Sequence, residues 1–130
     1  MGGALLWDAH SIRSRVPRLF NGVLPDFNWG TGGGSSAAPG LAENLARIVH
    51  LDGRYSAVAN GRFTGGYITR QYGRPEQNVH AVQLELSQRN YMEEQMPYRY
   101  DDDRAEMIQP LLQNLIRAAL DFVTGEEWSK

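Results

Sequence analysis

Apolar runs at three places along the chain predict the strands of a sheet. Residues 4–10 form a short apolar run with glycines before it and polar residues after it, which is typical of a buried strand. Because strands this apolar usually lie in sheets that are covered on both faces, we expect residues 4–10 to lie inside the sheet. Residues 55–60 are a second strand candidate, and residues 79–86 alternate between two faces as a strand does.

Two further segments repeat apolar residues at helical spacing, and the first of them is residues 40–50. Its apolar residues, among them Leu41, Leu45 and Val49, fall on one face, and polar residues fall on the other. Gly53 is expected to end this helix. One side of the helix is therefore predicted to pack against the sheet.

Residues 103–123 predict the longest helix. The aspartates at 101–103 provide an N-cap and place acidic charge at the positive end of the helix dipole. Pro110 predicts either a kink or the true first turn, because proline lacks the backbone N–H of a helix interior. The wide apolar stripe of this helix consists of Met107, Ile108, Leu111, Leu112, Leu115, Ile116, Ala119, Leu120 and Val123.

Glycines and prolines separate these elements. Residues 11–40 are predicted to form one long loop, which includes a glycine-rich stretch at 31–36. This stretch lacks the spacing of both phosphate-binding fingerprints, so we interpret it as a flexible or ligand-covering loop. The order strand, loop, helix, strand, loop, strand, helix predicts an α/β fold with helices on the faces of a sheet.

Composition narrows the class of protein. The chain has 130 residues, of which 42% are hydrophobic and 22% charged, and it contains no cysteine. These values predict a single globular domain over residues 1–130, without a disulfide scaffold or a thiolate metal site. No apolar run reaches the roughly 18–20 residues of a membrane span, and the first residues lack a secretory signal pattern. A net charge of −2 gives nucleic-acid binding no support, so we expect neither nucleic acid nor membrane as partner. The lack of cysteine favours a reducing cytoplasm.

Two residues at strand ends are the strongest candidates for chemistry. His10 ends the first predicted strand with Asp8 on the same side, and ligands of open α/β sheets gather at the carboxyl ends of strands. A histidine at this place can bind zinc, or it can be a hydrogen-bonded structural residue. Glu85 lies between leucines in the strand at 79–86. It is either a buried carboxylate with a raised pKa, suited to acid–base catalysis, or a solvent-facing side chain.

The other two histidines are predicted to be structural. His80 faces away from Glu85 on the same strand, and His50 ends a helix, where positive charge is favoured. The sequence contains neither a His-Glu-x-x-His zinc motif nor a Gly-x-Ser-x-Gly nucleophile motif.

Arginines gather in the predicted loops. Arg62, Arg70 and Arg74 flank a segment with two adjacent glycines that also contains Tyr67. Guanidinium groups match carboxylates, and glycines let the backbone approach a ligand closely, so these residues are predicted to bind a small acidic substrate. The alternative is a set of solvated surface charges.

Three segments of the chain carry motifs that occur together in a known family. Residues 7–28 contain Trp-Asp-Ala-His-Ser-Ile-Arg-Ser, Pro-Arg-Leu-Phe and Leu-Pro-Asp-Phe-Asn. Residues 60–70 read Asn-Gly-Arg-Phe-Thr-Gly-Gly-Tyr-Ile-Thr-Arg, and residues 79–92 read Val-His-Ala-Val-Gln-Leu-Glu-Leu-Ser-Gln-Arg-Asn-Tyr-Met. Taken in order through nearly the whole chain, these segments resemble the N-formylglutamate amidohydrolase (N-formylglutamate deformylase) family.

This resemblance implies a fold, a cofactor and a reaction. The fold is a mixed α/β sheet of the zinc carboxypeptidase-like (phosphorylase/hydrolase-like) superfamily with one zinc ion. The reaction is hydrolysis of N-formyl-L-glutamate to formate and L-glutamate, which is the last step of one histidine degradation route. By the resemblance, His10 matches a zinc ligand and Glu85 matches the glutamate that activates the zinc-bound water. The arginines would then hold the glutamate carboxylates, which follows from their chemistry.

The family is substantially longer than this chain, which resembles only its C-terminal half. The superfamily takes a further histidine and a glutamate ligand from an upstream segment, so His10 by itself cannot hold a catalytic zinc ion. We therefore expect a fragment with weak or no activity of its own. The alternatives are an inactive remnant that binds small acidic metabolites, or a subunit completed by a separate N-terminal half or by homo-oligomerisation.

Overall fold

A four-stranded mixed sheet organises residues 3–125, which are the residues that the computed structural model describes. The strands are β1 (Ala4–Ile12), β2 (Phe27–Gly30), β3 (Ala57–Ala59) and β4 (Val79–Ser87), and they lie in the order β1-β4-β2-β3. β1 is parallel to β4 and β3 is parallel to β2, whereas β2 and β4 are antiparallel. The α/β fold and the mixed sheet are therefore confirmed.

β4 is the central strand of this sheet. It pairs with β1 along its whole length, from Val79 opposite Ala4 to Ser87 opposite Ile12, and it pairs with β2 on its other side. Every residue of β4 after Val79 is buried. The alternating segment predicted at 79–86 thus forms the middle of the structure, where both of its faces are covered.

β1 forms where a strand is predicted, but its position differs from the prediction. Within residues 3–125 it pairs only with β4, so it is an edge of the sheet. Leu6 keeps 37% of its surface exposed, and Ala9 and His10 are also exposed. The expectation that this strand lies inside the sheet is wrong for the described residues, because none of them forms a neighbouring strand along its outer edge.

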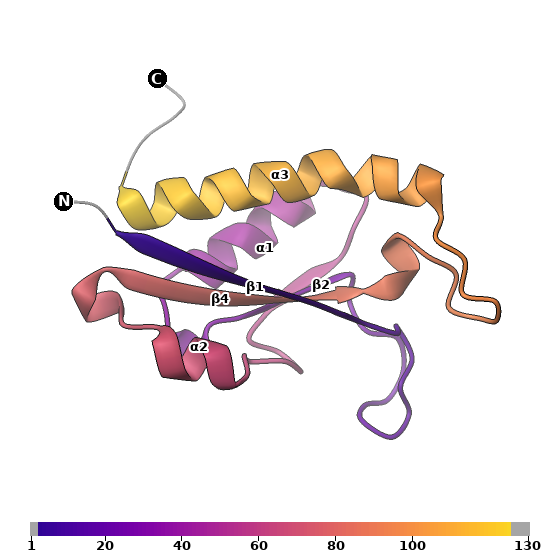
Figure 1. Cartoon of the computed structure of the whole chain (residues 1–130), viewed down its shortest axis with the longest axis horizontal. Helices are drawn as coiled ribbons and strands as arrows, with labels where there is room; N and C mark the ends of the chain where they lie inside the picture. Colours follow the sequence, from indigo (N-terminus) through magenta and orange to yellow (C-terminus); the bar gives the residue numbers. More distant parts are fainter. Residues whose placement is uncertain (1–2, 126–130) are drawn as a thin grey trace.

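Two long helices cover one face of the sheet, and a short helix lies on the other face (Figure 1). α1 (Leu41–Asp52) and α3 (Asp102–Thr124) pack against each other, as their apolar stripes predict. α1 ends at Gly53, whose φ of 84° suits a residue without a side chain. None of the helices described within residues 3–125 combines the length and the hydropathy needed to cross a membrane.

The start of α3 has the predicted N-cap, and Pro110 does not mark its first turn. The Asp101 side chain accepts a hydrogen bond from the backbone N–H of Arg104 at 3.0 Å, which confirms the N-cap. Pro110 lies inside the helix. The alternative that Pro110 marks the first turn is therefore wrong.

Two elements occupy segments that are predicted to be loops. β2 lies within residues 11–40, so the interpretation of that segment as one long loop is wrong. It has only four residues, all of them buried, which is too short for a recognisable alternation. α2 (Tyr67–Tyr72) has six residues, and Gly66 before it offers no side chain as a cap. Both elements are formed by contacts with distant parts of the chain rather than by a local pattern.

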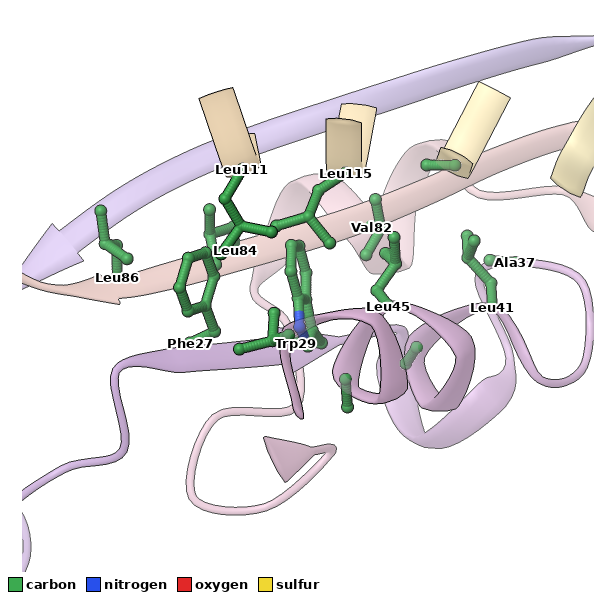
Figure 2. Close-up of a cluster of buried hydrophobic side chains, with 14 of the residues drawn as sticks. Phe27, Trp29, Ala37, Leu41, Leu45, Val82, Leu84, Leu86, Leu111 and Leu115 are labelled. Atoms are coloured by element: carbon green, nitrogen blue, oxygen red, sulfur yellow. The ribbon is translucent and has the colours of Figure 1, made fainter. Parts of the chain in front are cut away.

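The apolar face of the sheet and the helices α1 and α3 enclose the hydrophobic core (Figure 2). Phe27 and Trp29 of β2 are fully buried, and their rings stack with centroids 5.8 Å apart. Figure 2 shows Leu111 and Leu115 of α3 reaching toward these rings and toward Leu84 of β4. The removal of these side chains from water is the main source of stability for the fold.

Candidate active site

The opposite face of the sheet is polar along its centre. Strand alternation and the register place Asp8 and His10 of β1 beside Gln83 and Glu85 of β4, respectively. On the other side of β4, Asn28 of β2 lies directly opposite Glu85. Polar side chains from three strands thus meet around Glu85, an arrangement that the pattern of a single strand does not reveal.

Glu85 is buried, with 8% of its surface exposed. Burial raises the pKa of its carboxyl group, because the charged form loses its hydration; His10 partly opposes this shift and Asp8 adds to it. Within residues 3–125 the Glu85 carboxylate accepts no hydrogen bond. Of the two interpretations of Glu85 from the sequence, the structure supports the buried carboxylate. The alternative, a solvent-facing side chain, is wrong.

His10 lies next to Glu85 at the open edge of the sheet. Its side chain is 48% exposed, and its Nε2 atom lies 3.0 Å from Oδ1 of Asp8. This contact orients the imidazole ring, so the two residues form a polar pair beside the buried carboxylate. His10 also lines an apolar groove that α3 forms with the sheet.

Two buried oxygen atoms on this side of the sheet have no hydrogen-bond partner within residues 3–125. They are Oδ1 of Asn28 and Oγ of Ser87, which follows Glu85 on the same face of β4. The Asn28 amide nitrogen donates to the carbonyl oxygens of Pro25 at 2.9 Å and of Glu85 at 3.0 Å, so only its oxygen remains free to accept. Buried polar atoms without partners are uncommon and suit a place where water or a ligand binds. Sequence reasoning missed Asn28 because it lies in a predicted loop.

A hydrogen bond holds the segment before α2 against the polar face. The backbone N–H of Gly66 donates to Oε1 of Gln83 at 2.9 Å. The approach needs glycine, because a Cβ on Gly30 would lie 2.6 Å from the backbone nitrogen of Gly65. As a result, α2 begins at Tyr67 over β4 and β1, on the side of the sheet that carries the candidate site. The alternation of β4 in the sequence already places Gln83 on the same face as Glu85, so Gln83 could have been predicted as a site residue from that pattern.

The predicted substrate-binding residues are exposed, and none of the three arginines forms an ion pair within residues 3–125. Arg62 donates to the carbonyl oxygen of Leu19, in the segment that connects β1 with β2. Arg70 donates to the carbonyl oxygen of Gly65 at 3.2 Å. Arg70 and Tyr67 both belong to α2, so the structure brings them to the polar face.

Arg74 lies at the other end of β4. Its backbone pairs with Val79, the first residue of that strand, and its Nη1 atom donates to the carbonyl oxygen of Gly73 at 2.7 Å. Val79 and Glu85 are separated along the strand by about 20 Å, at roughly 3.3 Å per residue. The structure therefore does not bring Arg74 together with Glu85.

The remaining histidines have structural contacts. His80 accepts a hydrogen bond from the backbone N–H of Ala38 at Nδ1, and its Nε2 lies 2.8 Å from Oδ1 of Asn78. Burial lowers the pKa of His80, which favours the neutral ring. His50 lies 3.1 Å from the carbonyl oxygen of Ala57. These contacts agree with the structural roles that their positions predict.

The described residues do not form a metal site by themselves. Within residues 3–125 no group of three or more His, Asp or Glu side chains is placed to hold a metal ion. A catalytic zinc ion usually has about three protein ligands. The donor set around His10 therefore does not fit zinc unless further ligands come from outside these residues.

Known proteins match this chain over most of its length. Residues 1–92 match the family model described as N-formylglutamate amidohydrolase. The chain belongs to the N-formylglutamate amidohydrolase family. It is 56% identical over 119 residues to the N-formylglutamate deformylase of Pseudomonas aeruginosa, and equally identical over the same length to that of Pseudomonas putida. The family expected from the motifs is confirmed.

A solved structure shares the fold. The crystal structure of N-formylglutamate amidohydrolase from Ralstonia eutropha JMP134 matches with a TM-score of 0.70 at 23% identity, and the match covers 93% of this chain. It covers only 42% of that chain, and each deformylase match covers 45% of the relative. This amidohydrolase-family chain therefore spans less than half the length of the proteins that it matches.

Proposed function

We propose that this chain supplies the general acid–base group of an N-formylglutamate deformylase, which hydrolyses N-formyl-L-glutamate to formate and L-glutamate. The observation that carries the proposal is the buried Glu85 carboxylate beside His10. It lies in a chain that is 56% identical to two proteins named N-formylglutamate deformylase.

Glu85 moves one proton in this reaction. It accepts a proton from the attacking water while the water oxygen bonds to the formyl carbon. When the C–N bond breaks, the carboxyl group delivers that proton to the amine nitrogen of the leaving L-glutamate. Burial suits this task, because a carboxylate with a raised pKa is a stronger base than an ordinary glutamate.

Arg62 and Arg70 bind the substrate carboxylates, with Tyr67 beside Arg70 on α2. Their guanidinium groups form no ion pair within residues 3–125, so their charges remain available to an anionic ligand. The hydrogen bond from Gly66 to Gln83 brings α2 to the polar face of the sheet. Arg74 is less suitable, because it lies at the far end of β4.

No step of this mechanism is routed through a metal, because the described residues do not form a metal site. The zinc ion implied by the family would take His10 together with ligands from outside residues 3–125. We further propose that the reaction belongs to histidine degradation in the cytoplasm. The family resemblance supports this placement, and the lack of cysteine agrees with a reducing compartment.

The test measures formate release from N-formyl-L-glutamate. The purified chain is assayed alone and together with a second polypeptide, namely the part of the Pseudomonas aeruginosa deformylase that this chain does not match. We expect hydrolysis from the mixture and little from the chain alone. Glu85→Gln in the mixture is expected to lower the rate by about 100-fold or more, the usual contribution of a general acid–base group.

Glu106→Gln is the matched control, because Glu106 is an exposed carboxylate on α3. It is expected to leave the rate unchanged. Equal rates for Glu85→Gln and the unmodified chain would overturn the role of Glu85. Binding of L-glutamate without hydrolysis by any mixture would favour the alternative, a remnant that binds small acidic metabolites through its arginines.

A further inference from the structure

A cavity of about 390 Å³ lies at the carboxyl ends of β1 and β4. The two strands are parallel and stay in register up to Ile12 and Ser87, so the chain leaves both of them at the same end of the sheet (Figure 1). Ligands of α/β sheets bind at this end of the strands, which makes the cavity a suitable place for part of a substrate. The residues that line it come from both strand ends, and they are Ser11, Ile12, Arg13, Gln88, Met92 and Tyr98.

Arg13 is the charged residue in the lining of this cavity. It is exposed, and its guanidinium group forms neither an ion pair nor a hydrogen bond within residues 3–125. Gln88 and Tyr98 add an amide and a phenol hydroxyl to the lining, and both groups can donate hydrogen bonds. Because the lining residues include a guanidinium and neutral donors but no carboxylate, the cavity favours a carboxylate as its ligand.

Contacts on both sides of Arg13 along the chain hold its backbone in place. The backbone N–H of Ser14 donates to Oε2 of Glu94 at 2.6 Å, and the Ser14 hydroxyl donates to Oε1 at 2.5 Å. On the other side, Oγ of Ser11 lies 2.7 Å from the hydroxyl oxygen of Tyr91. Both Glu94 oxygens thus accept from Ser14, so Arg13 keeps its charge for a ligand. A fixed backbone with a free guanidinium lowers the entropic cost of binding an anion.

The distance from the cavity to His10 and Glu85 matches the length of the proposed substrate. Ile12 follows His10 by two residues on β1, which is about 6.6 Å along the strand at roughly 3.3 Å per residue. In N-formyl-L-glutamate, five bonds separate the formyl carbon from the carbon of the side-chain carboxyl group, and in an extended conformation they span about 6 Å. The carboxylate on the α-carbon is only three bonds away and does not reach so far. A formyl group beside Glu85 therefore places the side-chain carboxylate at the level of the cavity.

We propose that Arg13 binds the side-chain carboxylate of the substrate in this cavity and thereby selects N-formyl amino acids with an acidic side chain. This subsite rests on the proposed function, because it names the group of that substrate which the chain recognises. Arg70 belongs to α2 on the polar face, whereas Arg13 adds a positive charge at the strand ends. N-formyl-L-glutamine has the same length and no charge on its side chain, so it loses the ion pair with Arg13.

The experiment compares hydrolysis of N-formyl-L-glutamate and N-formyl-L-glutamine by the mixture of this chain with the part of the Pseudomonas aeruginosa deformylase that it does not match. Arg13→Gln is expected to raise KM for N-formyl-L-glutamate about tenfold or more with little change in kcat, and to leave KM for N-formyl-L-glutamine unchanged. Arg13→Lys keeps the charge without the planar fork and should recover part of the loss.

Arg15→Gln is the matched control, because Arg15 is an exposed arginine of the same segment that does not line the cavity. It is expected to leave both KM values unchanged. An unaltered preference for N-formyl-L-glutamate in Arg13→Gln, or equal effects of Arg13→Gln and Arg15→Gln, would overturn the subsite.

A binding measurement separates the subsite from the proposed function. The chain by itself is titrated with L-glutamate and with L-glutamine and followed by NMR, because its own residues line the cavity. We expect L-glutamate to bind more tightly, and Arg13→Gln to remove most of that difference. Selectivity that depends on Arg13, in a chain whose mixture does not hydrolyse N-formyl-L-glutamate, would support the subsite and overturn the function. Hydrolysis with a preference that does not depend on Arg13 would support the function and overturn the subsite, and equal binding of both amino acids would overturn the subsite as well.

Discussion

Leu84 and Glu85 are neighbours on β4, and both are buried, but they face opposite sides of the sheet. Leu84 contacts the core formed with α1 and α3, where apolar side chains fill the space between the layers. Glu85 faces the polar side, where Asn28 and Ser87 each keep a buried oxygen without a partner. Within residues 3–125 the apolar face is filled by packed side chains, with Nε1 of Trp29 as its one buried polar atom without a partner, whereas the polar face holds a buried carboxylate and two such oxygen atoms.

The apolar face of β4 contributes mainly to stability, and the polar face carries the candidate functional residues. Burial of the apolar face supplies the free energy that keeps the chain folded. The polar face retains a buried carboxylate and unpaired acceptors, which are costly for the fold and useful only when a ligand or a further part of the protein meets them. The comparison predicts that substitutions on the two faces have opposite consequences for stability.

The largest loss of stability is expected from Leu115→Ala, on the apolar side. Leu115 is fully buried in the core, so the truncation leaves a cavity and is expected to lower the free energy of unfolding by about 3 kcal/mol. Leu120→Ala on the same helix removes an equal side chain that is 45% exposed, and its effect is expected to stay below about 1 kcal/mol. Urea denaturation followed by circular dichroism measures both, and equal losses would contradict the assignment of the core.

Asp26→Asn tests a polar cluster that is fully satisfied, unlike the surroundings of Glu85. The Asp26 carboxylate accepts hydrogen bonds from Ser56, Arg89 and Asn90 at 2.9–3.0 Å. Burial raises its pKa, but these bonds outweigh burial and hold the pKa below the ordinary value of 3.8. We expect Asp26→Asn to lower the free energy of unfolding by about 2 kcal/mol at pH 7.

The sign of the pH dependence follows from that lowered pKa. The Asp26 carboxylate stabilises the folded state fully above the unfolded pKa of 3.8, and this stabilisation is lost as the pH falls through the lower folded pKa. The unmodified chain is therefore expected to lose more stability than Asp26→Asn when urea denaturation is repeated below pH 4. Glu106→Gln, at an exposed carboxylate beyond the first turn of α3, is the control. Parallel acid profiles for the unmodified chain and Asp26→Asn would show that the cluster does not act in this way.

Glu85→Gln is expected to raise the stability of the fold, whereas Leu115→Ala and Asp26→Asn lower it. A neutral amide removes a buried charge that accepts no hydrogen bond within residues 3–125, so the free energy of unfolding at pH 7 should rise by up to about 1 kcal/mol. The same urea assay measures it. A loss as large as that of Leu115→Ala would place Glu85 among the residues that stabilise the fold, and the comparison of the two faces would fail.

The smallest effect is expected from Gln83→Leu, and it should be local. This variant removes the acceptor for the Gly66 N–H, which is worth about 1 kcal/mol or less. Hydrogen exchange at Gly66 should become faster, whereas the urea midpoint changes little. Gln83→Glu keeps an acceptor at the same place and should preserve the protection. Faster exchange in both variants, or in neither, would show that this hydrogen bond does not hold the segment before α2.

The sequence predicts the elements whose signal is repeated many times. α1, α3 and β4 form close to their expected bounds, because long apolar stripes and alternation survive changes at single positions. β2 and α2 are missed for the converse reason: each is short, and each is stabilised by partners far away in the chain. For the candidate site, alternation separates Glu85 from His80 and identifies its face. It does not reveal that Asn28 lies opposite Glu85, because that pairing joins β2 to β4.

By itself, the sequence determines the family, the α/β class, and which side of each long element is apolar, because these depend on local spacing and on motifs. The tertiary structure decides which strands are neighbours. It brings His10 beside Glu85, moves Arg74 away from it, and leaves β1 at the edge. The physical reason is that strand order is set by backbone pairing between distant segments. The side-chain pattern of one strand shows which of its residues are buried, but it does not show which other strand lies beside it.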